Sequence, residues 1–207
     1  MRLKPPRWWI VAGFLSLIPA CASAQEAAVY TTYYDDGTLQ WERSYRDGKQ
    51  DGVTRCYFPT GSLQGESRFE NGKLHGIFKT FQPDGKPESE LAYADDRLEG
   101  VSRFYYPGGE LQMEVTFKAD RREGPSREYF ENGDLKTEWN YRAGELDGLT
   151  RQYYPGGRLK AEAQFAGGKR NGVTRTYGDD GKPLFTHLYD RGHLLSSTPG
   201  AAEAMSS

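Results

Sequence analysis

Hydrophobic and polar positions along this chain form short β-prone runs that recur at a fixed interval. Residues 53–58 and 63–69 both interleave aromatic and aliphatic residues with polar ones, and the sequence Pro59-Thr60-Gly61 separates them. Such runs are typical of half-buried β-strands, and a proline followed by a glycine is typical of a tight turn. Each pair of runs therefore predicts a β-hairpin. Apolar residues do not recur at the 3.6-residue spacing of a helix.

The hairpin unit repeats every 24 residues without insertion or deletion, so seven copies fill residues 30–194. A single hairpin is only marginally stable, so neighbouring copies must share their stability. The sequence predicts an all-β fold, a single elongated antiparallel sheet of seven tandem hairpins that twists into a trough or open solenoid. Two glycine columns mark the repeat, Gly37, Gly61, Gly85, Gly109, Gly133, Gly157 and Gly181, and Gly52, Gly76, Gly100, Gly124, Gly148 and Gly172.

Aromatic residues form further columns at the same interval, and we expect them to stack along the array and bury one face. One column begins at Tyr33 and Tyr57, and another at Tyr45 and Phe69. The second turn of each unit carries residues that tolerate left-handed backbone geometry, such as Asn71-Gly72. Both features support a chain of hairpins.

Charged residues alternate in sign from one predicted strand to the next. A cross-strand ladder of this kind would fix the register, because a slipped strand would meet like charge. A two-residue turn at Thr60-Gly61 would pair Arg55 with Glu66, whereas a three-residue loop with a bulge would pair Tyr57 with Leu63 and place Arg55 and Glu66 on opposite faces. The ladder favours the first form, and Pro59 favours the second. The alternating residues are Glu42, Arg55, Glu66, Lys79, Glu90, Arg103, Glu114, Arg127, Glu138, Arg151, Glu162 and Arg175.

The first 24 residues have the pattern of a signal peptide. A basic start precedes the apolar run 8–20, and Ala22-Ser23-Ala24 is a small-residue cleavage site. A competing interpretation is a lipoprotein signal, in which Cys21 would be lipidated and become the new N-terminus. Both interpretations predict export, to the periplasm or the medium in the first case and to the outer membrane in the second.

The mature chain is predicted to be mildly acidic. Removal of Arg2, Lys4 and Arg7 from the 27 basic residues leaves 24 against 29 acidic ones, a net charge of −5. This balance argues against a nucleic-acid partner. Cys56 is the one cysteine of the mature chain, so no intrachain disulfide can form. Residues 195–207 are rich in Ser and Ala and are predicted to be a disordered tail.

The unit "GLTRQYYPGGRLKAEAQFAGGKRNG" resembles the variant MORN repeat, and within that family the exported bacterial group labelled as YwqK-type antitoxin proteins. The resemblance covers almost all of the mature chain. The chain departs from the family pattern at Pro87 and Pro183, which replace a leucine, and at Gly178, which replaces the second aromatic residue. The residues that carry it are Gly148, Tyr153, Tyr154, Gly157, Leu159, Glu162, Phe165, Gly168, Lys169 and Gly172.

The resemblance implies a non-catalytic scaffold associated with membrane lipids in some settings and with protein partners, including toxins, in others. The residues also argue against an enzyme. His75, His187 and His193 have no Cys, Asp or Glu at metal-ligand spacing, and Cys56 has no local nucleophile signature. We therefore expect no catalytic residues, no metal site and no cofactor.

A monomeric scaffold that binds a protein partner is the predicted function, with an antitoxin or immunity-like role as one form of it. The alternatives are a membrane-associated protein, held by lipidated Cys21 or by basic residues, and a cell-wall glycan-binding protein. For stacking on glycan rings, the mature chain offers only two tryptophans, Trp41 and Trp139. If Tyr105, Tyr129 and Tyr153 face the core, the next residues face away. The candidate partner-binding residues are Tyr106, Phe130, Tyr154, Arg103, Arg127 and Arg151.

Overall fold

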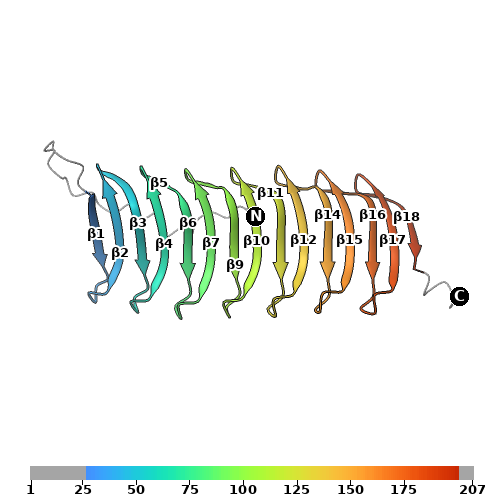
Figure 1. Ribbon diagram of the computed structural model, residues 1–207, viewed down its shortest axis with the longest axis horizontal. Coiled ribbons are helices and arrows are strands. Elements are labelled where there is room, and N and C mark those ends of the chain that lie inside the picture. Colours follow the sequence, from blue (N-terminus) through green and yellow to red (C-terminus); the bar gives the residue numbers. More distant parts are fainter. Residues whose placement is uncertain (1–26, 201–207) are drawn as a thin grey trace.

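A computed structural model of the protein describes residues 27–200 and shows one long β-sheet (Figure 1). The predicted signal peptide, residues 1–24, and the alternative lipidation site Cys21 lie outside the described residues, as do residues 201–207. Within the described residues no helix has the length and apolarity needed to cross a membrane.

Eighteen strands follow one another along the sheet. Their bounds are β1 (Ala27–Tyr33), β2 (Leu39–Arg46), β3 (Lys49–Tyr57), β4 (Leu63–Glu70), β5 (Lys73–Leu74), β6 (Gly76–Phe81), β7 (Pro87–Ala94), β8 (Arg97–Leu98), β9 (Gly100–Tyr105), β10 (Leu111–Lys118), β11 (Arg121–Tyr129), β12 (Leu135–Arg142), β13 (Glu145–Leu146), β14 (Gly148–Tyr153), β15 (Leu159–Ala166), β16 (Lys169–Tyr177), β17 (Pro183–Asp190) and β18 (His193–Pro199).

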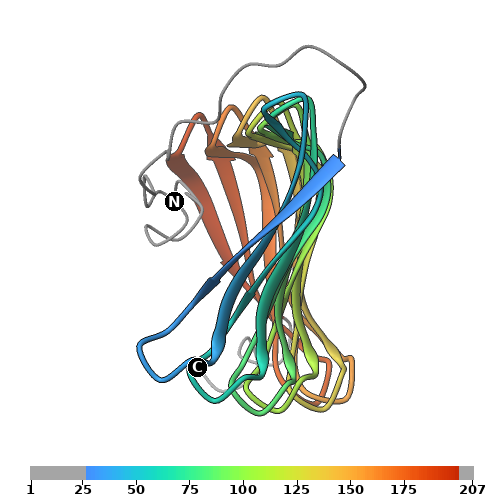
Figure 2. The same cartoon turned by 90° about the vertical axis from the view of Figure 1, so that its left-hand side faces the viewer.

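All strand pairs are antiparallel and join segments that follow each other in the sequence, so the sheet is an open meander. β5 and β6 both pair with β4, β8 and β9 both pair with β7, and β13 and β14 both pair with β12, so each of these couples is one strand interrupted at one residue. The end view shows strands that rotate progressively along the array, so the sheet is coiled (Figure 2). The predicted fold class is confirmed.

Two kinds of turn alternate along the two long edges of the sheet. At residues 58–62, Gly61 N–H donates to Phe58 O and Phe58 N–H donates to Ser62 O, both at 2.8 Å, which closes a three-residue loop. At the other edge, a two-residue turn such as Asn71-Gly72 places both residues at positive φ, 52° and 84°. Two successive left-handed residues match the twist of the hairpin. Gly72 N–H also bonds Gln50 O of the preceding repeat at 2.7 Å, which ties the copies together.

A bulge one residue beyond the three-residue loop resolves the conflict between the two predicted registers. Tyr57 pairs with Leu63, as the loop requires, but the next pair is Cys56 with Gly65, which leaves Gln64 unopposed. The additional residue shifts the phase of β4 by one, so Arg55 pairs directly with Glu66. Both pairings, predicted as alternatives, are therefore present in the structure.

The second glycine column lies inside the strands, where the ladder is again irregular. Tyr45 pairs with Gln50 and Arg43 with Thr54, so one residue of β2 faces three of β3. Gly52 lies in this segment at φ +107°. A Cβ at this position would lie 2.9 Å from the Cβ of Ser44, so both the backbone conformation and the close approach require glycine.

The core occupies one face of the sheet, here called the core face, and is densest in the middle of the array. Phe78 and Val115 are 1% and 2% exposed, and they pack in a cluster with other buried residues of β7, β8 and β10. The remaining buried members are Leu91, Tyr93, Leu98 and Phe117. Buried hydroxyl residues line the same face along the array, and Cys56 lies on it nearer the N-terminal end.

Two sequence expectations differ from the structure. The Tyr57 column was expected to join the Phe69 column in the core, but Tyr57 lies on the opposite face, where its hydroxyl donates to Glu42 at 2.7 Å. The bulge accounts for this difference, because it offsets the two columns by one side-chain position. The array also extends beyond residue 194: residues 195–199, which were assigned to a disordered tail, belong to β18, and Thr198 pairs with Thr186.

Candidate binding surface

The alternating charges form one unbroken ladder on the face opposite the core, here called the charged face. Arg103 pairs with Glu90 on one side and with Glu114 on the other, and the same relationship holds at every rung from Glu42 to Arg175. The ladder ends at Thr31, opposite Glu42, and at Thr186, opposite Arg175. The predicted cross-strand ladder is therefore confirmed.

Contacts around Arg103 and Arg55 in the ladder are asymmetric. Arg103 Nε donates to Glu114 Oε1 at 2.9 Å within its own hairpin, whereas Arg103 Nη1 lies 3.7 Å from Glu90 Oε2 of the preceding repeat. Arg55 repeats this pattern, at 2.7 Å to Glu66 and 3.8 Å to Glu42. The hydrogen bond to Glu66 raises the pKa of Arg55. Each guanidinium keeps part of its surface and donor set open to solvent.

A row of tyrosines runs beside the ladder on the charged face. Tyr129 donates its hydroxyl to Glu114 Oε2 at 3.3 Å, and Tyr177 donates to Glu162 Oε1 at 3.5 Å, so each ring is tied to the carboxylate of the preceding repeat. Partial burial and the nearby carboxylate raise the pKa of both phenols. These rings are half-buried and fixed in place.

Exposed aliphatic residues adjoin the ladder in the middle of the array. Ile77 and Val101 are 44% and 39% exposed. Each lies two residues before a ladder cation, Lys79 or Arg103, and therefore on the same face. The charged face thus combines arginine, tyrosine and exposed aliphatic side chains in a regular, rigid array.

The structure separates the six predicted partner-binding residues into two groups. Arg103, Arg127 and Arg151 belong to the charged face as ladder members. Tyr106 and Tyr154 instead lie at the turn edge, where their hydroxyls donate to main-chain oxygens of the next repeat, Tyr129 O at 2.8 Å and Tyr177 O at 3.0 Å respectively. These two tyrosines therefore link adjacent repeats.

Phe130 occupies the equivalent turn position, and the Nζ of Lys136 lies 5.8 Å from its ring centroid. The aromatic residues that do accompany the arginines are Tyr105, Tyr129 and Tyr153, which the sequence analysis assigned to the core. The signal that could have revealed this is the three-residue Pro-x-Gly loop together with the charge ladder, since only a bulge satisfies both.

Cys56 is buried on the core face and is 1% exposed. Its thiol contacts Gly65 O at 3.8 Å, and burial raises its pKa to about 12. The thiol therefore stays protonated near neutral pH, and Cys56 has a packing role. Among residues 27–200 no cluster of three or more His, Cys, Asp or Glu is arranged to hold a metal ion.

Comparison with known families identifies the repeat. The family described as MORN repeat variant matches residues 50–73, 74–95, 98–119, 122–143 and 146–166, which together make up more than half of the chain. No curated protein matches the chain. The narrower resemblance to exported antitoxin-like proteins stays a prediction.

Proposed function

The chain belongs to the MORN repeat variant family, and from this premise we propose that it is a non-enzymatic scaffold whose charged face binds a protein partner. One observation carries the proposal: arginines and tyrosines of successive repeats stand beside exposed aliphatic residues on a single face. Arginine and tyrosine dominate the energetics of protein interfaces, and apolar contact surrounds them there.

Rigidity of the face supports this role. The Tyr129 hydroxyl is bound to Glu114, and Arg127 Nε donates to Glu138 at 3.2 Å, so both side chains are ordered before any partner arrives. A preorganised surface loses less conformational entropy on binding. The alternating charges would also select the register of a partner, because a shift by one rung would oppose like charges.

We further propose that the protein acts outside the cytoplasm, as residues 1–24 predict, and that its partner is a toxin-like or other secreted protein. Protection by such a scaffold would be steric: the extended face would cover a surface that the partner needs for its own activity. This role requires no catalytic group.

Affinity capture from cell-envelope extract tests the proposal when variants are compared. The bait is the mature chain, beside Arg103→Glu/Arg127→Glu on the charged face and Arg121→Glu, a charge reversal at an exposed hairpin end. Circular dichroism checks that all three are folded. We expect one stoichiometric protein with the parent and with Arg121→Glu, and its loss with the double variant. Recovery of lipid or peptidoglycan alone, or a partner retained by the double variant, contradicts the proposal.

A further inference from the structure

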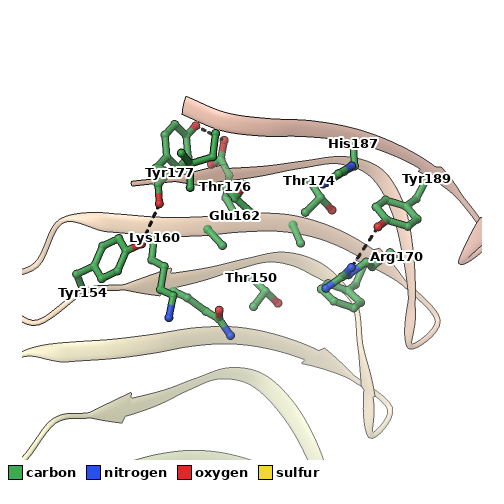
Figure 3. Close-up of a pocket in the computed structure, with 15 residues that line it drawn as sticks. Thr150, Tyr154, Lys160, Glu162, Arg170, Thr174, Thr176, Tyr177, His187 and Tyr189 are labelled. Atoms are coloured by element: carbon green, nitrogen blue, oxygen red, sulfur yellow. Dashed lines mark hydrogen bonds between the residues drawn. The ribbon is translucent and has the colours of Figure 1, made fainter. Parts of the chain in front are cut away.

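A groove opens on the core face at the C-terminal end of the array, away from the charged face. It has a volume of about 380 Å³ and lies over β14, β15, β16 and β17 (Figure 3). This volume falls at the lower end of the range of about 300–1,000 Å³ in which small ligands bind. Of the six predicted partner-binding residues, Tyr154 alone lines it.

Small side chains create the groove. Ala163 occupies the position that Leu91 and Val115 fill in the third and fourth repeats, and Thr150 occupies the position of Phe78. Leu91, Val115 and Phe78 form the dense core of the middle repeats. The same backbone positions therefore carry a filled core in one part of the array and an open groove in another.

The floor of the groove holds buried polar atoms without hydrogen-bond partners. The hydroxyls of Thr150 and Thr174, on side chains that are only 8% and 5% exposed, have none, and neither has Nδ1 of His187. In the same column Thr54 accepts from Gln50 at 2.7 Å, and Ser102 accepts from Ala92 N–H at 3.2 Å. Burying an unpaired hydroxyl is unfavourable, so a ligand that pairs with these groups gains from doing so.

Two other buried hydroxyls, those of Ser67 and Ser126, are also unpaired but do not line the groove. They show that an orphan hydroxyl alone does not define a site. What distinguishes Thr150 and Thr174 is that both lie beneath open space. Ser126 therefore provides a matched control.

Each end of the groove carries a tyrosine with a cation beside it. The Nζ of Lys160 lies 5.3 Å from the ring centroid of Tyr154, and the guanidinium carbon of Arg170 lies 5.4 Å from that of Tyr189. Figure 3 shows these two pairs on either side of the threonine floor. Arg170 Nη1 donates to the Tyr189 hydroxyl at 3.3 Å, which leaves its other donors available.

Aromatic surface continues along one wall. His187 stacks on Phe185, with ring centroids 5.8 Å apart, and its edge meets Tyr189 at 6.2 Å. Glu162 is the one acidic residue in the lining, and its carboxylate belongs to the ladder on the charged face, where it accepts from Arg175 at 2.8 Å and from Tyr177 at 3.5 Å. The lining therefore favours a neutral or anionic ligand over a cation.

We propose that this groove binds an acidic saccharide, one or two pyranose rings long. Its hydroxyls would pair with Thr150, Thr174 and His187, since a hydroxyl can both donate and accept. The C–H faces of its rings would pack on the aromatic side chains, and its carboxylate would bind Arg170 or Lys160 in a charge-assisted hydrogen bond. A protein segment fits less well, because the groove floor is the interior of the sheet, where main-chain groups are already paired in the ladder.

Titration calorimetry with two defined disaccharides tests this site on the mature chain. The probes are digalacturonate and the neutral disaccharide of galactose. We expect digalacturonate to bind with a Kd about tenfold or more below that of the neutral probe, a difference in the range of one charge-assisted hydrogen bond. Arg170→Gln should remove most of this preference.

Three variants locate the binding. Ala163→Leu, which restores the residue found at Leu91, should abolish binding while the chain stays folded by circular dichroism and urea unfolding. Thr174→Val should weaken it about fivefold or more, by the loss of one hydrogen bond. Ser126→Ala should leave it unchanged. The proposal is overturned if neither saccharide releases heat, if Ala163→Leu binds as the parent does, or if cross-linking places a protein in the groove.

These variants lie on the core face, so their failure is distinguishable from failure of the protein-binding proposal. Loss of the protein partner in Arg103→Glu/Arg127→Glu would leave saccharide binding intact. Loss of saccharide binding in Ala163→Leu would leave the protein partner bound.

Discussion

Arg103 lies between two carboxylates on the charged face: its Nε donates to Glu114 Oε1 at 2.9 Å, and its Nη1 lies 3.7 Å from Glu90 Oε2. The first contact is within one hairpin and the second joins two repeats. Because side chains alternate between faces, a slip of β9 by one residue against both neighbours would remove both contacts. The ladder thus fixes the register between copies whose sequences are otherwise almost interchangeable.

Charge reversal at Arg103 should therefore destabilise the array more than neutralisation. Arg103→Gln removes two attractive contacts, each worth about 0.2–1 kcal/mol in cross-strand pairs. Arg103→Glu also places three carboxylates side by side. Urea unfolding measures both variants, and the difference between them should shrink in high salt because these groups are partly exposed. Equal stability of the two variants would contradict the ladder as a determinant of register.

The sequence predicted most of the fold because the repeat restates each feature several times. Gly61 and its counterparts indicated the loops, and the alternating signs from Glu42 to Arg175 indicated the pairing. It did not predict that a bulge at Gln64 would allow Tyr57 to pair with Leu63 and Arg55 with Glu66. No residue type marks a bulge of this kind, and the need for it appears only when the three-residue loop and the charge ladder are considered together. That single omission placed Tyr57 and its column on the wrong face.

The candidate surfaces were predicted only in part, for the same reason. The arginines were assigned correctly to an open face, because charge identifies exposure. Tyr106 and Tyr154 were placed with them, although their hydroxyls link neighbouring repeats through main-chain contacts. The sequence did not predict the groove, because the groove arises from the smaller side chain of Ala163 at the position of Leu91 and Val115. A smaller side chain at one repeat position does not form a recognisable motif.

Adjacent residues of β6 should respond very differently to truncation. Phe78 is 1% exposed in the core cluster, so Phe78→Ala should lower the free energy of unfolding by about 3–5 kcal/mol. Ile77, its neighbour, lies half exposed on the other face, and Ile77→Ala should change the free energy of unfolding by about 1 kcal/mol or less. Chemical denaturation of both variants provides the comparison. Similar losses would mean that the core is not confined to one face.

Gly52 and Gly61, one from each glycine column, should differ in their tolerance of alanine. Gly52→Ala places a Cβ 2.9 Å from the Cβ of Ser44 at φ +107°, so strain and collision add together. Gly61 also has a positive φ, +84°, but a Cβ added there would have Thr38 Cγ2 as its nearest neighbour, at 3.9 Å. We expect a loss of about 1 kcal/mol for Gly61→Ala and of about 2–3 kcal/mol for Gly52→Ala, as judged by urea unfolding. The reverse order would contradict the close packing at Gly52.

Alkaline pH should weaken the array through the tyrosines of the charged face. Burial, followed by the hydrogen bond to Glu42, raises the pKa of Tyr57 from 10 to about 12. A group whose folded pKa is raised contributes stability that is fully present below pH 10 and is lost as the pH rises through about 12. The pKa values of Tyr105, Tyr129 and Tyr177 shift in the same direction.

Unfolding midpoints measured between about pH 9 and pH 12 should therefore fall, and Tyr57→Phe should flatten the slope because phenylalanine cannot ionise. Tyr33→Phe, at an exposed position of the edge strand β1, is the matched control. A midpoint that holds steady through this range would show that the tyrosine–glutamate contacts do not contribute to stability.

Deletion of a whole repeat should be tolerated far better than deletion of a single residue. Removal of residues 100–123 joins Glu99 to Gly124, and this junction has the same Glu-Gly sequence as Glu123-Gly124 in the parent. It also brings Glu90 opposite Arg127, so the signs of the ladder still alternate. The shortened chain should unfold cooperatively, and its free energy of unfolding should depend less on urea concentration because less surface becomes exposed.

Deletion of Gln112, the unopposed residue of β10, removes the bulge instead. Either the loop loses its closing pair or Val115, 2% exposed in the core, turns to the charged face. We expect this loss to exceed about 3 kcal/mol. If the chain without Gln112 unfolds at the same urea concentration as the parent, the bulge does not determine which face each side chain occupies.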